Sequence, residues 1–279
     1  MRTIVFAMHL QDPHHLRLRQ YRDGSRLAAR QRLHQKFSTA RIPWHRFVFQ
    51  ALRLPPEARI LEVGCGQGAL WASNLPLIPS SWRLTLTDLT EGMVAEARTA
   101  LGKLADRVTL LAADARRLPF KDGAFDAVVA NHMLYHDPDR PAALSEFHRV
   151  LAPRGLLLAA TNGPAHLHEL RELLRSCGAA DREVPDSAFD LETGTRQLAP
   201  WFTRVSVRRQ AGGLAVIDPE AVCDYLRSLP GRRLTRGQEE RVRRSVADAI
   251  ARHGCWWVTA DAGIFRGRRR ARALVPGGG

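Results

Sequence analysis

A short apolar strand that runs into a glycine-rich turn is the feature that most constrains this chain. Residues 60–68 read Ile-Leu-Glu-Val-Gly-Cys-Gly-Gln-Gly. Glycine adopts positive φ angles readily, and it lets a ligand approach the backbone because no Cβ is in the way. Ligands of open α/β sheets bind at the carboxyl ends of strands. The segment therefore predicts a ligand site, although its Gly-x-Gly-x-Gly spacing differs from the Gly-x-Gly-x-x-Gly of nicotinamide-binding enzymes.

Strands and helices alternate on both sides of this turn. The apolar runs that predict strands lie at residues 59–63, 82–87, 108–112, 125–130 and 155–160. Segments with helical spacing of apolar residues lie between them, at residues 91–104 and 140–151. Such alternation is typical of a parallel sheet that helices cover on both faces. The sequence therefore predicts an α/β fold.

Polar residues follow successive predicted strands. Glu62 precedes the glycine turn, Asp88 ends the second strand, Asp114 follows the third and Asn131 ends the fourth. A carboxylate in the position of Asp88 can accept hydrogen bonds from both hydroxyls of a ribose. Single residues of this kind often only cap helices. Four of them in this order favour a nucleoside-containing ligand instead.

These segments resemble the motifs of class I S-adenosylmethionine-dependent methyltransferases. The matching stretches are LEVGCGQG, LTLTDLTEGM, AADARRLPF, FDAVVANHMLYHDPD and RVLAPRGLLLAAT. The last of them carries Arg154 before Gly155, where the family has a Pro-Gly-Gly turn. Outside residues 56–162 the chain resembles, more weakly, a bacterial branch of the family that is related to ubiquinone/menaquinone C-methylases. The resemblance implies S-adenosyl-L-methionine as cofactor and a Rossmann-like, doubly wound, mostly parallel seven-stranded sheet, with an N-terminal helical cap and a helical insertion between the last two strands.

The resemblance gives the glycine turn a cofactor role. It implies that Gly64, Cys65, Gly66 and Gly68 pack against the methionine and ribose portion of the cofactor. It also implies that Glu62 holds the turn and faces the cofactor's amino group, directly or through water.

The ends of the next strands are expected to hold the rest of the cofactor. The resemblance implies that Asp88 binds the ribose hydroxyls and that Leu89 lies under the adenine. Asp114 is expected to accept from the adenine amino group, and the Ala115 N–H to meet a ring nitrogen. Asn131 is expected to line the side from which the methyl group leaves.

The acceptor side offers four candidate catalytic residues, for each of which a structural hydrogen bond is the alternative role. They are His132 and His136 after the fourth strand, and Tyr21 and His34 in the N-terminal helical stretch. Transfer from a sulfonium requires alignment and exclusion of water, and an oxygen or nitrogen acceptor also requires a base. We expect a small-molecule acceptor in secondary or cofactor metabolism, methylated on oxygen, nitrogen or carbon.

Two alternatives to a small-molecule methyltransferase stay open, the first of them because of the basic charge. The formal net charge is +14, and 39 of the 42 basic residues are arginine, a skew that is typical of a high-GC coding bias. An RNA methyltransferase is the first alternative, but no Asn/Asp-Pro-Pro-aromatic motif, lysine tetrad or RNA-binding module is present, so no specific nucleic-acid partner is expected. A non-methylating protein on the same fold is the second.

Changes in composition and in the order of predicted strands and helices along the chain predict five segments. They are an N-terminal helical cap at 1–43, the cofactor-binding core at 44–218, a helical cap insertion at 219–254, the last core strand at 255–267 and a disordered basic tail at 268–279.

The remaining composition points to a cytoplasmic protein. The four cysteines form no Cys-x-x-Cys pair, which is typical of a reducing compartment. No apolar stretch approaches the roughly 20 residues of a membrane span. His132 and His136 lack an evident third ligand, so no metal is expected.

Overall fold

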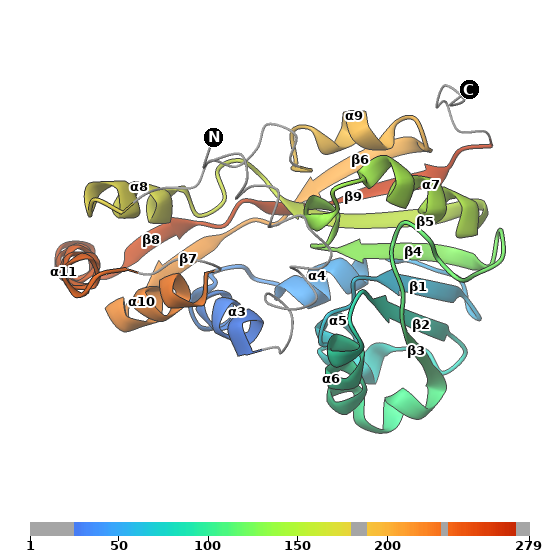
Figure 1. Ribbon diagram of the computed structural model, residues 1–279, viewed down its shortest axis with the longest axis horizontal. Helices are drawn as coiled ribbons and strands as arrows, with labels where there is room; N and C mark the ends of the chain where they lie inside the picture. Colours follow the sequence, from blue (N-terminus) through green and yellow to red (C-terminus); the bar gives the residue numbers. More distant parts are fainter. Residues whose placement is uncertain (1–24, 180–188, 230–233, 272–279) are drawn as a thin grey trace.

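A seven-stranded sheet in the order β3-β2-β1-β4-β5-β9-β6 organises the chain (Figure 1). The computed structural model describes residues 25–179, 189–229 and 234–271. In sheet order, the strands are β3 (Val108–Ala112), β2 (Arg83–Asp88), β1 (Arg59–Val63), β4 (Phe125–Asn131), β5 (Leu151–Asn162), β9 (Ala262–Arg269) and β6 (Phe202–Arg209). The pairings from β3 through β5 are parallel, and β9 is antiparallel to both β5 and β6. The predicted mostly parallel seven-stranded sheet is confirmed.

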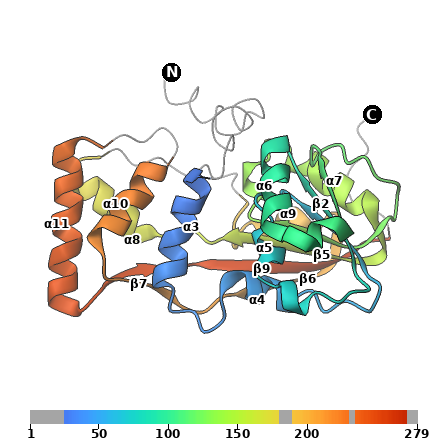
Figure 2. The ribbon, with the colours of Figure 1, turned by 90° about the horizontal axis from the view of Figure 1, so that it is seen from below.

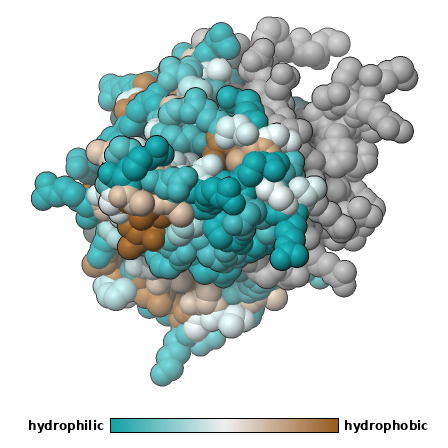
Figure 3. Space-filling model, turned by 90° about the vertical axis from the view of Figure 1, so that its left-hand side faces the viewer, coloured by the Kyte–Doolittle hydropathy of each residue, from teal (hydrophilic) through white to brown (hydrophobic). Residues whose placement is uncertain are grey.

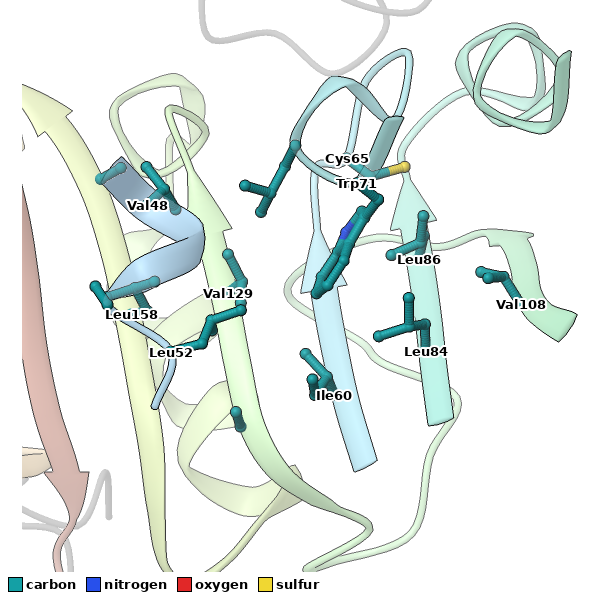
Figure 4. Packing of buried hydrophobic residues seen from close by; sticks show 14 of the residues in the cluster. Val48, Leu52, Ile60, Cys65, Trp71, Leu84, Leu86, Val108, Val129 and Leu158 are labelled. Atoms are coloured by element: carbon teal, nitrogen blue, oxygen red, sulfur yellow. The ribbon is translucent and has the colours of Figure 1, made fainter. Parts of the chain in front are cut away.

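Helices cover both faces of this sheet, because its strands carry apolar residues on both sides. One face packs against α4 (Trp44–Gln50), α5 (Ala69–Ala72) and α6 (Glu91–Leu101). Figure 4 shows Val48 of α4 near the strands that carry Leu158 and Val129, and Trp71 of α5 over the strand that carries Ile60. The other face packs against α7 (Arg140–Val150) and α9 (Gly194–Leu198). Short 3-10 turns lie at η2 (Leu75–Leu77), η3 (Gly102–Arg107) and η4 (Leu134–His136).

A cap with its own hydrophobic cluster lies at one end of the sheet (Figures 1 and 2). It consists of α3 (Ser25–Phe37), α8 (His168–Ser176), α10 (Pro219–Ser228), α11 (Arg236–His253) and a two-stranded sheet of β7 (Gly213–Val216) and β8 (Trp256–Thr259). Leu33 of α3, Leu170 of α8 and Val222 of α10 are among its buried residues. The outer side of the cap is mainly hydrophilic, with small hydrophobic areas (Figure 3). The predicted helical insertion, α10 and α11, thus lies between β6 and β9.

Two antiparallel chain segments join core and cap. β6 leads into β7, β8 leads into β9, and the Gln210 N–H donates to the Ala262 carbonyl, 2.9 Å away, where the segments pass between the sheets. We predicted one strand over residues 256–265, but the structure splits it at Ala260 and Asp261. The reason lies at Asp261, whose carbonyl accepts from the Gly163 N–H at 2.8 Å and whose carboxylate pairs with Arg209. β7, which we placed in the core, pairs with β8 and packs into the hydrophobic cluster of the cap, so it belongs to the cap.

The arginine-rich end also differs from expectation. We predicted that the last core strand ends at residue 267 and that a disordered tail begins at 268, but β9 continues to Arg269. Arg268 is in register with Leu156 of β5, so sheet pairing fixes this part of the run. The Arg270 carbonyl lies 2.8 Å from Nε2 of His148. Residues 272–279 lie outside the described residues. None of the helices within the described ranges combines the length and hydrophobicity needed to cross a bilayer.

Candidate active site

The glycine turn between β1 and α5 requires its glycines. Gly64, Gly66 and Gly68 have φ angles of 69°, 54° and 71°, which L side chains rarely adopt. A Cβ on Gly64 would lie 2.7 Å from Cβ of Met133, whereas real Cβ atoms do not approach so closely. Cys65, at the tip of β1 in Figure 4, is buried, and its N–H donates to the Thr87 carbonyl at 2.9 Å. The turn is therefore held tightly between β2 and the segment after β4.

Glu62 is buried beneath this turn. Its Oε2 accepts a 2.6 Å hydrogen bond from Nε1 of Trp71 on α5. The pKa of Glu62 is raised to about 8, chiefly by burial and in smaller part by the nearby charge of Asp88, while the Trp71 hydrogen bond opposes the rise. Glu62 thus ties the strand to the helix that follows the turn, as expected for a residue that holds the turn. The sequence interpretation did not identify Trp71 as its partner.

The raised pKa of Glu62 predicts a pH-dependent stability. Below pH 4.5 Glu62 is protonated in both folded and unfolded chains, so its protonation does not lower the free energy of unfolding there. Between pH 4.5 and 8 only the unfolded chain releases the proton, so the free energy of unfolding falls by about 1.4 kcal/mol per pH unit. We expect Glu62→Gln to remove this loss. Urea unfolding at pH 5, 6.5 and 8 measures it, and parallel pH profiles for wild type and variant would contradict the assignment.

Asp88 spans the turn from the end of β2. Its Oδ2 accepts from the Gly66 N–H at 2.9 Å, and its Oδ1 accepts from the N–H and hydroxyl of Thr90 at 3.2 and 3.4 Å. Burial raises the pKa of Asp88, and these bonds oppose the rise. Leu89, half-buried, follows directly. The structure thus brings the predicted ribose carboxylate into contact with the glycine turn.

Asp114 is held by an arginine that sequence reasoning missed. Nε and Nη2 of Arg116 donate to its two oxygens at 3.0 and 2.7 Å, and the Arg116 N–H donates to Oδ1 at 2.9 Å. Ala115 between them is buried. Because guanidinium and carboxylate form a two-point pair, the orientation of the predicted adenine-binding carboxylate is fixed. The Asp-Ala-Arg spacing was the available signal.

Trp44 fastens helix α4 to the end of β4. Its Nε1 donates to Oδ1 of Asn131 at 3.2 Å, and its ring centroid lies 4.8 Å from that of His132. His132 has a φ of 58°, and its N–H donates to the Ala160 carbonyl at 3.1 Å. The pKa of His132 is lowered to about 3, chiefly by burial and in smaller part by nearby His34, His45 and His136. His132 is therefore neutral at physiological pH.

The other acceptor-side candidates divide into three cases. His34 of α3 stacks on His166, with ring centroids 5.4 Å apart and an interplanar angle of 3°. Burial lowers the pKa of His34 to about 4. His136 lies beside Tyr135, with centroids 4.4 Å apart. Tyr21 lies outside the described residues. The sequence interpretation missed His166, which follows β5 and faces the cap.

The described residues contain no group of three or more His, Cys, Asp or Glu side chains arranged to hold a metal ion. All four cysteines are free thiols, and Cys65 is the one that lies in the turn.

Comparison with known proteins bears on the same segment. A family model described as a methyltransferase domain matches residues 61–159. A malonyl-[acyl-carrier protein] O-methyltransferase of Geobacter sulfurreducens is 37% identical over 151 residues, 54% of this chain and 52% of the relative. A demethylmenaquinone methyltransferase of Symbiobacterium thermophilum is 33% identical over 114 residues, 40% of this chain and 45% of the relative. The chain thus spans about half the length of these curated relatives.

The fold also has solved counterparts. The crystal structure of a methyltransferase candidate from Bacillus halodurans has a TM-score of 0.55 and 17% sequence identity, and the match covers 81% of this chain and 98% of that chain. At this identity the likeness shows a shared fold. The family match, however, covers the residues that build the glycine turn and the strand ends around it. The chain therefore belongs to the class I S-adenosylmethionine-dependent methyltransferases, and its relatives include demethylmenaquinone methyltransferases.

Proposed function

We propose that this protein transfers a methyl group from S-adenosyl-L-methionine to a small organic acceptor. The observation that carries the proposal is the contact between the Asp88 carboxylate and the Gly66 N–H, because it places a hydroxyl-binding group against a turn that a Cβ would fill. The sulfonium supplies an already activated methyl group, so the protein has to bind, align and exclude water. The proposal places the reaction in the cytoplasm, supported by four free thiols.

Each strand end is proposed to bind a different part of the cofactor. In this proposal Asp88 takes the ribose hydroxyls beside Leu89, while Asp114 and Ala115 receive the adenine edge. The glycine turn, residues 64–68, approaches the methionine portion without obstructing side chains. This division is supported by the Arg116 pair, which leaves Asp114 oriented at the end of β3.

Glu62 and Asn131 complete the cofactor side of the proposal. Glu62 is buried below the turn, and a cationic amino group placed near it would favour its ionised form. Asn131 and His132 close the methyl side, where Trp44 holds the amide of Asn131 in place.

The acceptor side is proposed to lie between the core and the cap. His132 comes from the core, whereas His34 comes from α3 of the cap. Curated relatives carry names with two kinds of acceptor, a malonyl group on acyl-carrier protein and demethylmenaquinone. The proposal therefore includes an acceptor that is linked to a carrier protein as well as a free small molecule.

Cofactor binding is the direct test. We expect calorimetry to detect binding of both S-adenosylmethionine and S-adenosylhomocysteine and none of NAD, because the turn has Gly-x-Gly-x-Gly spacing. We also expect label from methyl-labelled cofactor to appear in a small acceptor. A protein that binds neither cofactor form would refute the proposal.

A further inference from the structure

The sheet face on which α4 packs extends beyond this helix to β9 and β6. α4 lies near the strands that carry Leu158 and Val129, which are β5 and β4 (Figure 4). β9 follows β5 in the sheet, and β6 follows β9. Two arginines of β9 belong to this face. Arg266 is in register with Leu158 and Arg268 with Leu156, and residues directly opposite each other on paired strands share a face.

Arg208 of β6 joins these two arginines on the same face. Its Cζ lies 4.1 Å from the ring centroid of Phe47 on α4, and its Nη2 donates to the Phe47 carbonyl at 3.4 Å. Ser206 is directly opposite Arg266, so Arg208 lies on the diagonal from Arg266. Diagonal neighbours lie about 7–8 Å apart, and residues two apart along a strand roughly 7 Å apart. The three side chains, which we call the arginine cluster, can therefore reach one shared ligand.

The arginine cluster is open to solvent and has no carboxylate partner among the described residues. Arg208 and Arg268 are exposed, and Arg266 is half-buried between them. Arginines elsewhere in the described chain do pair with acids, as Arg59 does with Asp126 at 2.9 Å. Within the ranges that the structure describes, none of the ion pairs includes a member of the cluster. The positive charge of the cluster is thus left uncompensated.

Arg266, at the centre of the cluster, has an unsatisfied donor as well. Its Nε is buried and has no hydrogen-bond partner in the described part of the chain. Burial is the main cause that lowers its pKa, and nearby Arg268, Arg53 and Arg208 lower it too. A buried donor without a partner and crowded like charges both cost folding free energy. An anion bound between the arginines would relieve both costs.

The number and type of these donors favour a phosphate group over a single carboxylate. A guanidinium presents a planar fork of N–H donors that matches the oxygens of either group. A carboxylate has one negative charge and two oxygens, which one arginine can engage. A phosphate monoester has up to two negative charges and three acceptor oxygens, so it can bind several arginines at once. The hydroxyl of Ser206, opposite Arg266, adds a further donor on this face.

We propose that Arg208, Arg266 and Arg268 form a binding site for a phosphate group with two negative charges, carried by a free phosphorylated molecule or by a lipid with a phosphomonoester headgroup. The proposed cofactor site lies at the ends of β1, β2, β3 and β4, whereas β9 and β6 lie beyond β5. The phosphate site is therefore separate from it, and the inference does not depend on the proposed methyl transfer.

Titration with inorganic pyrophosphate tests the site directly. We expect calorimetry to detect binding to the full chain in chloride buffer, and Arg266→Met to weaken it at least tenfold. Arg268→Met changes an exposed side chain and should weaken binding at least threefold without disturbing the fold. Arg244→Met removes an exposed arginine from α11 and is the matched control, so it should bind as wild type does. Absence of binding to wild type, or equal binding to Arg266→Met, would overturn the inference.

Thermal unfolding distinguishes a binding site from a structural cluster. Without pyrophosphate, Arg266→Met should be at least as stable as wild type, because the change removes an unsatisfied donor and a crowded charge. Pyrophosphate should raise the unfolding midpoint of wild type, since it binds the folded chain, and should leave that of Arg266→Met unchanged. The same rise in both proteins would contradict the assignment.

Further ligands identify the source of the phosphate. Flotation with phosphatidylcholine vesicles, with and without phosphatidic acid, tests the lipid. Recruitment by phosphatidic acid that is lost in Arg266→Met would assign the site to a headgroup, whereas pyrophosphate binding without recruitment would assign it to a free molecule. Pyrophosphate should not change the affinity for S-adenosylhomocysteine. Competition between the two, or Arg266-dependent binding of RNA without binding of pyrophosphate, would show the inference to be wrong.

Discussion

Replacing Asp88 with alanine is expected to weaken binding of S-adenosylmethionine and S-adenosylhomocysteine by about tenfold to a hundredfold, or roughly 1–3 kcal/mol. The carboxylate accepts two sets of hydrogen bonds that alanine cannot accept. It accepts from the Gly66 N–H at 2.9 Å, which fixes the turn, and in the proposed complex it accepts from the ribose hydroxyls. Both sets of donors would lose their partner together. Calorimetry with each cofactor form measures the loss.

The control variants define what the Asp88 result means. Asp106→Ala removes an exposed acid from the end of the η3 turn and should bind the cofactor as wild type does. Asp88→Asn retains one oxygen acceptor and should fall between wild type and Asp88→Ala. Full affinity in Asp88→Ala, with an unchanged unfolding midpoint, would show that the ribose is bound elsewhere.

Gly64→Ala is expected to have the second large effect, lowering the free energy of unfolding by on the order of 2–4 kcal/mol. Two causes add. The φ of 69° is strained for alanine, and the new Cβ would lie 2.7 Å from Cβ of Met133. Because the turn has to shift to relieve this contact, cofactor affinity should fall as well. Urea unfolding and calorimetry measure the two effects separately.

A double variant and a second glycine separate those causes. The change Met133→Ala cannot remove the Cβ contact but gives the neighbouring side chain room to shift, so the double variant should recover part of the loss. Gly102 has a φ of 53° with nothing within 4 Å of a built Cβ, so Gly102→Ala reports backbone strain alone. Equal losses in Gly64→Ala and Gly102→Ala would show that the contact with Met133 is unimportant.

The core was predictable because its signals are local. The strand-end residues Glu62, Asp88, Asp114 and Asn131 could be placed from short apolar runs, since parallel strands present their carboxyl ends on one edge of the sheet. The roles of these residues in binding remain predictions. The number of strands and their mostly parallel pairing followed from the family resemblance, whereas the order of the strands and the antiparallel pairing of β9 were not predicted.

The parts that sequence reasoning missed depend on contacts between distant segments. His166 is notable only because it stacks on His34, more than a hundred residues earlier. The division of residues 256–265 into two strands depends on Asp261, whose partners Arg209 and Gly163 lie in other elements. No periodicity within a single segment records such pairings.

The position of β9 in the sheet has a consequence for how the chain assembles during synthesis. β9 lies between β5 and β6, yet it begins at Ala262, about 100 residues after β5 ends at Asn162. At roughly 5–20 residues per second, the ribosome needs about 5–20 s to make the intervening chain. Throughout that interval β5 is an unpaired edge strand, and β6 has no neighbour in the sheet to join.

An unpaired edge strand rich in leucine invites pairing with other chains. β5 contributes Leu156, Leu157 and Leu158 to this edge. The nascent protein is therefore expected to be most prone to aggregate after β5 has emerged and before β9 has. When β9 emerges it can pair with β5 on one side and with β6 on the other, so the last described strand completes the sheet in a single step.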